Sequence, residues 1–144
     1  METEAIANIL GGRKVLGRDV KKPADLAQLV RGGLPAGSVT ALAAKLSLAN
    51  AELSRKLGIP QRTLTRRLSR QGRLTAAESD RAARLARVYA NAVEMIGGDE
   101  RAIQWLLTRN RALEGQRPFD LLDTDVGARE VEDLLGRIAY GVYS

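Results

Sequence analysis

The 144-residue chain contains no cysteine and no histidine, and only 3% of its residues are aromatic. The absence of cysteine excludes disulfides and thiolate metal sites, and the absence of histidine removes the commonest general base and metal ligand. The groups that most catalytic mechanisms use are therefore missing. We predict a protein that is not an enzyme and that holds neither a cofactor nor a metal ion.

Long apolar runs are also missing. No stretch approaches the roughly 18 apolar residues of a membrane span, and the opening METEAIANIL lacks the charged leader, apolar block and cleavage site of a secretory signal. We therefore expect a soluble cytoplasmic protein with no membrane partner. With so few aromatics, the core must consist of leucine, alanine, valine and isoleucine, which favours helices.

The formal net charge of +6 is distributed unevenly along the chain. Residues 1–50 carry +3, residues 51–74 carry +6, residues 75–116 carry no net charge, and residues 117–144 carry −3. A basic centre attracts polyanions, whereas nucleic acid would repel an acidic end. This asymmetry predicts that the centre and the C-terminal end serve different partners.

The basic centre has the pattern of a helix-turn-helix over residues 50–73. Two short helical patterns meet at a Leu57-Gly58-Ile59 turn, and Asn50 can cap the first helix while Gly58 ends it. Five apolar side chains can close a small wedge between the helices: Leu53, Leu57, Ile59, Leu64 and Leu68.

The second of these helices has a cationic outward face. At about 100° per residue, Arg62, Arg66 and Arg73 fall nearly opposite Leu64. Arginines can neutralise phosphates or contact guanine edges, and Gln61 near the helix start can pair with adenine. The candidate DNA-binding residues are Gln61, Arg62, Thr63, Thr65, Arg66, Arg67, Ser69, Arg70 and Arg73. The alternative is a solvated basic helix without a partner.

The remaining patterns predict an all-α fold, a helical bundle without strands. Pro23 can open a helix that Gly32-Gly33 ends, and another follows Pro35. Thr75 and Glu78 form a capping box that opens the longest helix, which Gly97-Gly98 stops. Asp99 and Thr124 can each cap a later helix. We divide the chain into an N-terminal helical region, 1–74, and a second helical domain, 75–144.

The last 28 residues contain the only Phe and two of the three Tyr. Aromatic residues near a terminus often anchor an interface, since they bury much surface at a small entropic cost. The alternative is that Phe119, Leu121, Leu122 and Tyr140 hold the final helix against the core. The first 20 residues also leave two interpretations, because Arg13, Lys14 and Arg18 fit either a basic arm on DNA or a loosely held terminus.

An ordered set of motifs resembles the Xre/MbcA/ParS antitoxins over nearly the whole chain. These motifs are GLPAGSVTALAAKLSL, LTRRLSRQGRLTAAESDR, the WL pair of AIQWLL, the P-x-x-LL-x-T-x-x-G turn and LGRIAYG. The resemblance implies an antitoxin of a type II toxin–antitoxin pair, with an Xre-like DNA-binding part and a C-terminal toxin-binding part. One departure is Pro60, which stands where a Ser or Thr cap is expected and removes one capping hydrogen bond.

The partner that the resemblance implies is a RES-domain toxin, an enzyme that consumes NAD. Family members cover its NAD pocket with their C-terminal region, and the complex represses its own operon. That region maps onto Pro118–Ser144. The candidate toxin-binding residues are Phe119, Leu121, Leu122, Thr124, Arg137, Tyr140, Tyr143 and Ser144. We further expect a homodimer that binds operator DNA, because operators are usually read as paired half-sites.

Two other functions stay open at this point. A stand-alone helix-turn-helix transcriptional regulator would need no toxin. An enzyme would have to use carboxylates such as Asp120, Asp123 and Asp125, but no His, Cys or glycine-rich phosphate loop accompanies them. These aspartates fit better at a helix start, where the helix dipole favours negative charge.

Overall fold

The computed structural model describes residues 2–141, and within that range all regular structure is helical apart from two isolated bridges, Pro35 with Arg73 and Asn110 with Gln116. This confirms the all-α prediction. The chain forms two compact units, the first ending at Ala86 and the second beginning at Arg87. The division falls inside the longest helix, α7 (Ala76–Ala92), whereas the expected division after residue 74 lies in the turn that precedes it.

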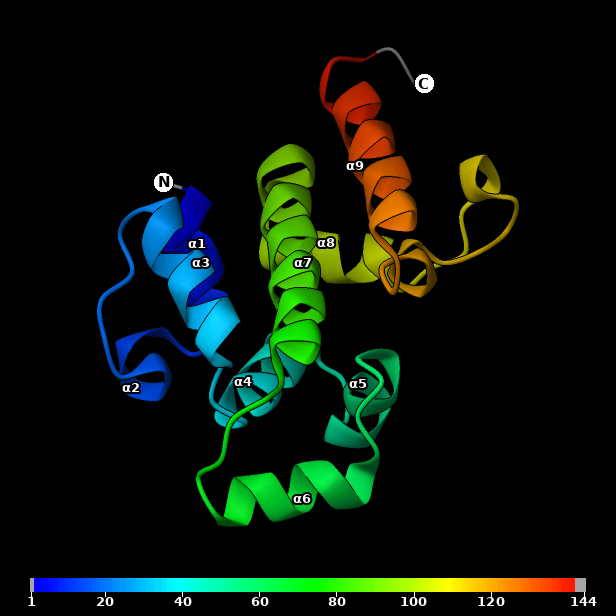
Figure 1. Ribbon diagram of the computed structural model, residues 1–144. Coiled ribbons are helices and arrows are strands. Elements are labelled where there is room, and N and C mark those ends of the chain that lie inside the picture. The colour runs from blue at the N-terminus through cyan, green and yellow to red at the C-terminus, as the bar shows by residue number, and fades with distance from the viewer. Residues whose placement is uncertain (1, 142–144) are drawn as a thin grey trace. The chain divides into compact units, whose positions relative to one another are not determined.

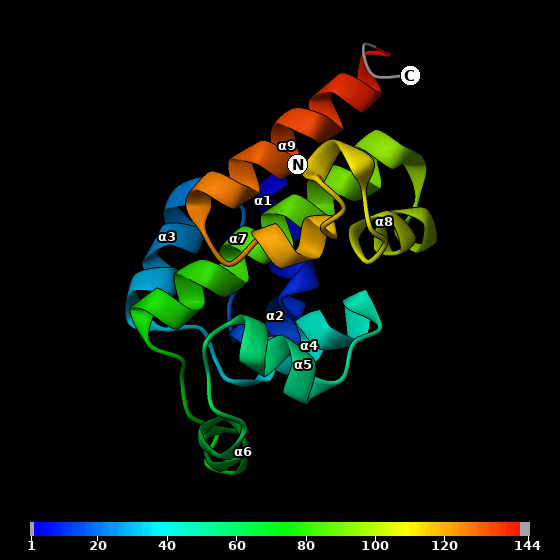
Figure 2. The ribbon, with the colours of Figure 1, turned by 90° about the vertical axis from the view of Figure 1, so that its right-hand side faces the viewer.

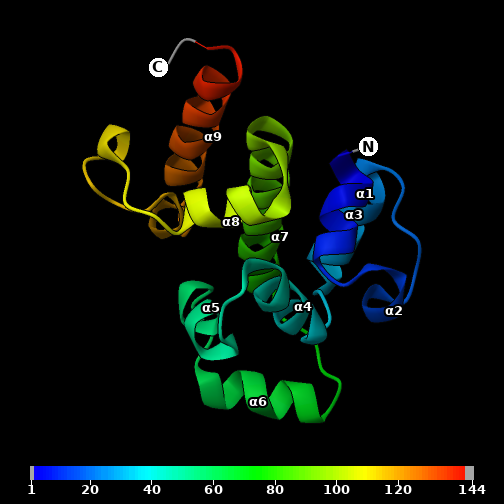
Figure 3. The same ribbon diagram turned by 180° about the vertical axis from the view of Figure 1, so that it is seen from behind.

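The N-terminal unit contains six helices besides the first part of α7 (Figures 1, 2 and 3): α1 (Glu2–Ile9), α2 (Gly12–Leu16), α3 (Pro23–Gly32), α4 (Gly37–Leu46), α5 (Asn50–Lys56) and α6 (Gln61–Ser69). Helix α1 packs against α2, α3 and α4. In all three views α6 lies at the end of this unit that is remote from α1 and α3. One face of α6 is therefore open to solvent.

Residues 2–20 are part of this unit's core and not a loosely held terminus. Ile6, Leu10, Leu16 and Val20 are each buried, with Leu10 fully inaccessible. The spacing of four and six between these residues does not form one clear helical stripe, because a turn at Gly11 interrupts it. That interruption explains why the sequence pattern left this segment open.

The predicted starts and stops of the helices are mostly confirmed. Pro23 opens α3, the Thr75–Glu78 capping box precedes α7, and Thr124 caps α9 by accepting a hydrogen bond from Gly127 N at 3.0 Å. The predicted Asn50 cap is wrong, because Ala49 is the N-cap of α5 and Asn50 is already its first helical residue.

The C-terminal unit follows α7 with a single π-helical turn, η1 (Val93–Gly97), and then α8 (Asp99–Leu106), two 3₁₀ turns, η2 (Arg111–Leu113) and η3 (Pro118–Leu121), and α9 (Asp125–Ala139). Both α8 and α9 pack against η1. The core of the unit includes Val88, Phe119, Val131, Leu134 and Leu135. No helix in the described part of the chain is both long and apolar enough to cross a bilayer.

Asp99 does not cap α8 as the sequence suggested. It is the first residue of the helix, the N-cap is Gly98, and the Asp99 carboxylate instead accepts a hydrogen bond from the Tyr89 hydroxyl at 2.9 Å. The pKa of Tyr89 is raised, mainly because the hydroxyl is buried and further because it donates a hydrogen bond to Asp99. This pair fixes the start of α8 to the end of α7.

Candidate functional site

The turn between α5 and α6 has the local structure that the sequence predicted. Gly58 adopts a left-handed φ of 74°. The amides of Gly58 and Ile59 donate to the carbonyls of Arg55 and Ser54 at 3.1 and 2.9 Å, which is the Schellman pattern of a helix end. The Ser54 hydroxyl also donates to the Ile59 carbonyl. This turn fixes the angle at which the chain enters α6.

An apolar wedge holds the two helices together. Leu53, Leu57, Ile59 and Leu64 are each at most 2% exposed, whereas Leu68 at the end of α6 is half-buried. The predicted wedge is thus confirmed, with Leu68 at its rim. Since Leu64 points inward, residues about half a helical turn away from it face solvent.

Six of the nine candidate DNA-binding residues are exposed on α6 or its C-cap: Gln61, Arg62, Thr65, Arg66, Ser69 and Arg70. The guanidinium groups of Arg62, Arg66 and Arg70 have no partner among the described residues. Thr63 is half-buried. Pro60 is the N-cap and offers no side-chain hydrogen bond, as its ring requires. The open face of α6 therefore presents three unpaired cations and several hydroxyl and amide groups.

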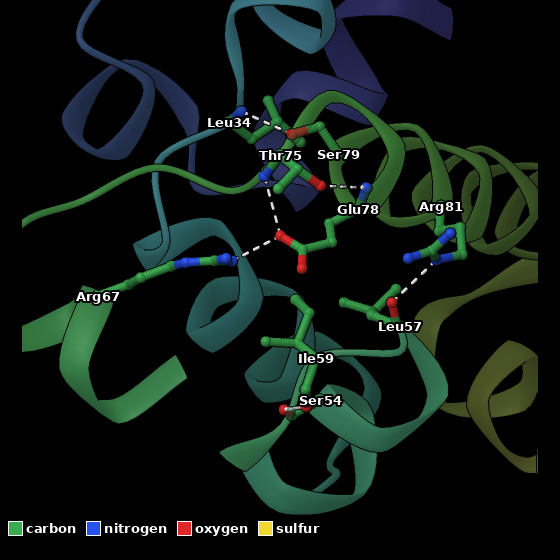
Figure 4. Close-up of polar contacts among 9 residues, drawn as sticks. All are labelled: Leu34, Ser54, Leu57, Ile59, Arg67, Thr75, Glu78, Ser79 and Arg81. Carbon is green, nitrogen blue, oxygen red and sulfur yellow. Dashed lines mark hydrogen bonds and ion pairs between the residues drawn. The ribbon is translucent and has the colours of Figure 1, made fainter. Parts of the chain in front are cut away.

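Two of the predicted arginines are bound to the protein itself. Arg67 is half-buried and donates to Glu78 Oε1 (Figure 4). Arg73 lies beyond the end of α6, in the segment that bridges to Pro35, and its guanidinium donates to the Gly33 carbonyl at 2.9 Å. The prediction that Arg73 shares the helical face of Arg62 and Arg66 is therefore wrong, because α6 ends at Ser69.

Glu78 occupies an unusual position for a carboxylate in this fold. Only 8% of the residue is exposed, and burial alone would raise its pKa. The hydrogen bond from Thr75 N and the contact with Arg67 outweigh that effect, so that the pKa of Glu78 is lowered. The side chain is therefore ionised at neutral pH.

The two units differ strongly in charge. Sixteen basic and seven acidic residues give residues 1–86 a formal charge of +9, whereas seven basic and ten acidic residues give residues 87–144 a charge of −3. The unit that contains α6 thus attracts polyanions. The other unit does not.

Candidate residues of the C-terminal unit divide into buried and exposed ones. Phe119 and Leu122 are each 1% exposed, and the Arg117 guanidinium lies 5.6 Å from the centre of the Phe119 ring. Burial to this degree makes both of them core residues, which agrees with the alternative that they hold the final helix in place. Leu121 is half-buried, and Thr124 is engaged as the cap of α9.

Helix α9 has an outward face opposite its apolar stripe. Taking Val131 as the centre of the buried side, the residues about half a turn away are Val126, Arg129, Asp133, Arg137 and Tyr140, all exposed. Val126 is 78% exposed and Tyr140 is 82% exposed. Tyr143 and Ser144, also expected to bind a partner, lie outside the described residues.

Val126 is a surface residue that the sequence interpretation missed. Its position relative to Val131 and Leu135 would have identified it, because an apolar residue on the polar side of an amphipathic helix breaks the pattern. On the inward side, Glu132 accepts two hydrogen bonds from Arg87 at 2.9 and 3.1 Å and one from Asn91 at 2.8 Å. These bonds fix the rotation of α9 and leave its outward face free.

No cluster of carboxylates within residues 2–141 is arranged to hold a metal ion. Asp120 pairs with Arg117 through two hydrogen bonds at 2.8 and 2.9 Å, and Asp125 pairs with Arg129 at 3.0 Å. Asp120 and Asp125, two of the three carboxylates that an enzyme would have to use, therefore serve as ion-pair partners near a helix start.

Comparisons with known proteins agree with the division into two units. Residues 25–87 match the antitoxin Xre-like helix-turn-helix domain, and residues 91–141 match the C-terminal toxin-binding domain of Xre/MbcA/ParS antitoxins. The chain is 39% identical to an Antitoxin Xre from Yersinia enterocolitica, over 91% of this chain and 92% of that protein. It is 37% identical to an Antitoxin Xre from Photorhabdus laumondii, over 81% and 79%.

Proposed function

Since the chain belongs to the Xre antitoxin family of toxin–antitoxin systems, we propose that it neutralises a RES-domain toxin through its C-terminal unit and represses its own operon through its helix-turn-helix. The observation that carries this proposal is the pair of chemically different free surfaces. One is the cationic face of α6 in a unit of charge +9, and the other is the outward face of α9 in a unit of charge −3.

The face of α6 fits a DNA major groove. Gln61 and Arg62 are at the helix start, where a recognition helix contacts base edges, and Arg66 and Arg70 follow toward its end. Arginines can donate two hydrogen bonds to guanine or neutralise phosphates. Two copies of the chain would place two such helices on paired half-sites, and we therefore also propose a homodimer. Light scattering that finds only monomer, alone and with toxin, would contradict this part.

The face of α9 fits a protein surface. Val126 and Tyr140 supply apolar contact area at its two ends, while Asp133 and Arg137 between them supply charges of both signs. Aromatic and arginine side chains are enriched among the residues that dominate binding energy at interfaces. We propose that this face and the chain end that follows it cover the NAD pocket of the toxin.

Two variants separate the two roles. Arg62→Ala combined with Arg66→Ala should abolish selective operator binding while the toxin's NAD consumption stays inhibited. A variant with Arg31→Ala and Lys45→Ala removes the same charge from exposed positions of the same unit outside residues 50–73, the two helices that meet at the Gly58 turn, and it should keep selective binding. Deletion of residues 136–144 should leave DNA binding in place and relieve the inhibition.

The readouts are gel-shift titration with DNA upstream of the protein's own reading frame and an NAD-consumption assay of the toxin encoded beside it. A folded Arg62/Arg66 variant that fails to inhibit the toxin would contradict the division of labour. A deletion variant that still inhibits would contradict the role of the C-terminal region. A wild-type chain that binds DNA selectively but leaves the toxin active would support the stand-alone regulator instead.

A further inference from the structure

Two polar contacts join the helix-turn-helix to the first six residues of α7 (Figure 4). Glu78 accepts from Arg67 of α6, and Arg81 Nε donates to the Leu57 carbonyl in the turn at 2.9 Å. Residues 78 and 81 are three apart and share a helical face. Both the recognition helix and the turn before it are therefore attached to the same face of α7.

The Glu78 carboxylate is itself fixed in place. Its Oε1 atom also accepts from Thr75 N at 2.9 Å, while Glu78 N donates to the Thr75 hydroxyl at 3.1 Å. The neighbouring Ser79, fully buried, accepts from Leu34 N at 2.8 Å. The acceptor that Arg67 meets is thus held by the capping box at the start of α7 and cannot follow a rotation of α6.

Arg67 differs from the arginines beside it. At about 100° per residue it lies roughly 60° from the buried Leu64, on the inward side of α6, whereas Arg66 lies roughly 160° away. Its side chain is 21% exposed, but Arg66 and Arg70 are exposed and have no partner among the described residues. A cation in this position is poorly placed to reach a phosphate.

We infer that Arg67 is a positioning residue, whose ion pair with Glu78 sets the rotation of α6 so that Arg62 and Arg66 face the bases; this rests on the proposed DNA-binding function. Leu64 is the buried apolar side chain of α6, and Leu68 is only half-buried at the rim of the wedge, so that apolar contacts by themselves leave the rotation of α6 about its axis weakly determined. The Arg67–Glu78 pair adds a directional contact near the helix end. Selectivity for the operator then depends on residues that do not touch DNA.

The decisive comparison uses Arg67→Met and Arg70→Met, which remove the same charge from α6 and its C-cap. The probes are a duplex covering the DNA upstream of the protein's own reading frame and a shuffled duplex of equal length and composition. Arg67→Met should reduce the preference for the first duplex about tenfold, the size of one lost base contact, with an unchanged salt dependence. Arg70→Met should keep the preference and reduce the slope of log K against log salt by about 0.9.

A second comparison removes a negative charge from α7 in place of a positive charge from α6. Glu78→Gln removes a negative charge near DNA, so that simple Coulomb attraction predicts tighter binding of the operator. The positioning role predicts weaker selective binding. Asp80→Asn is the matched control, because Asp80 lies two residues away on α7 with an exposed side chain paired to Arg84, and it should not weaken binding.

The outcomes are distinct. If Arg67→Met lowers the salt slope and keeps the preference, or if Glu78→Gln binds the operator more tightly, the positioning role is overturned while DNA binding stands. If the wild-type chain prefers neither duplex, both the proposed DNA-binding function and the positioning role of Arg67 are overturned. Melting curves show whether each variant is folded. If Glu78→Gln does not fold, Arg67→Met still tests the positioning role, because it leaves the Thr75–Glu78 capping box intact.

Discussion

Replacement by alanine should change the free energy of unfolding in opposite directions at two glycines of α9, Gly127 and Gly136. Gly127 is the third residue of the helix, and a Cβ added to it would overlap the Leu121 carbonyl oxygen, with the Leu121 carbonyl carbon at 2.9 Å and Thr124 Oγ1 at 3.0 Å. A Cβ added to Gly136 would meet nothing within 4 Å. Both glycines are helical, but Gly127 lies in the first turn of α9, where Thr124 caps it, and Gly136 lies in the open interior of the helix.

The magnitudes follow from these surroundings. In a helix interior alanine is more favourable than glycine by about 1 kcal/mol, and Gly136→Ala should raise the free energy of unfolding by that amount. At Gly127 the same gain is opposed by overpacking against backbone, about 2 kcal/mol, and by loss of the Thr124 cap, about 1 kcal/mol. Gly127→Ala should therefore lower the free energy of unfolding by about 2 kcal/mol.

Urea and thermal unfolding of both variants provide the assay. For a chain of this size each kcal/mol shifts the melting temperature by about 2–4 °C. Gly127→Ala should melt about 4–8 °C lower than the wild type, and Gly136→Ala about 2–4 °C higher. If Gly127→Ala equalled or exceeded the wild type in stability, the close approach of η3 to α9 would not exist as described.

Four further predictions concern the core, two titratable groups and the C-terminal surface. Leu64→Ala deletes a side chain that is 2% exposed and should cost about 2–5 kcal/mol in urea unfolding; a loss below 1 kcal/mol would mean that α6 is not packed on the wedge. Because the pKa of Glu78 is lowered, its contribution is fully present above the ordinary value of 4.5 and is lost as pH falls through the lowered one. In Glu78→Gln the free energy of unfolding should therefore fall less steeply as the pH is lowered below about 4.5 than it does in the wild type. An equally steep fall in both would contradict the lowered pKa of Glu78. Because the pKa of Tyr89 is raised, the wild type should lose stability above the ordinary tyrosine pKa of about 10; Tyr89→Phe should remove that loss and cost about 1 kcal/mol at neutral pH. Tyr140→Ala alters a side chain that is 82% exposed and should change stability by less than about 0.5 kcal/mol but weaken toxin binding by about 2 kcal/mol. Gln104→Ala, at an exposed position of α8, is its control in titration calorimetry, and equal affinities of the two variants would exclude Tyr140 from the interface.

Local rules of the chain were sufficient for the helix-turn-helix. Three features were predicted correctly: the buried apolar side chains of α5 and α6, among them Leu53 and Leu64, the left-handed Gly58, and the Thr75–Glu78 capping box. Each depends on the spacing of residues within a helix or on a single turn. Helical periodicity and helix-end hydrogen bonds are short-range properties, so that a single sequence contains the information for them.

The same rules could not assign the individual arginines. The sequence pattern placed Arg67 and Arg73 in one group with Arg62, but their partners lie 11 and 40 residues away, at Glu78 and Gly33. Whether an arginine is free for DNA depends on which acceptors the fold brings near it. That information exists only once α7 and the Gly33 segment have packed beside α6.

The sequence by itself determined the helical class, the position of the recognition helix and the opposite charges of the centre and the C-terminal end, because composition and helical periodicity act locally along the chain. Tertiary structure decided that Phe119 belongs to the core, that Val126 and Tyr140 stay exposed, and that Arg67 meets Glu78. These outcomes differ from the local ones because burial and ion pairing depend on segments distant in sequence, and the chain acquires them only when its helices pack.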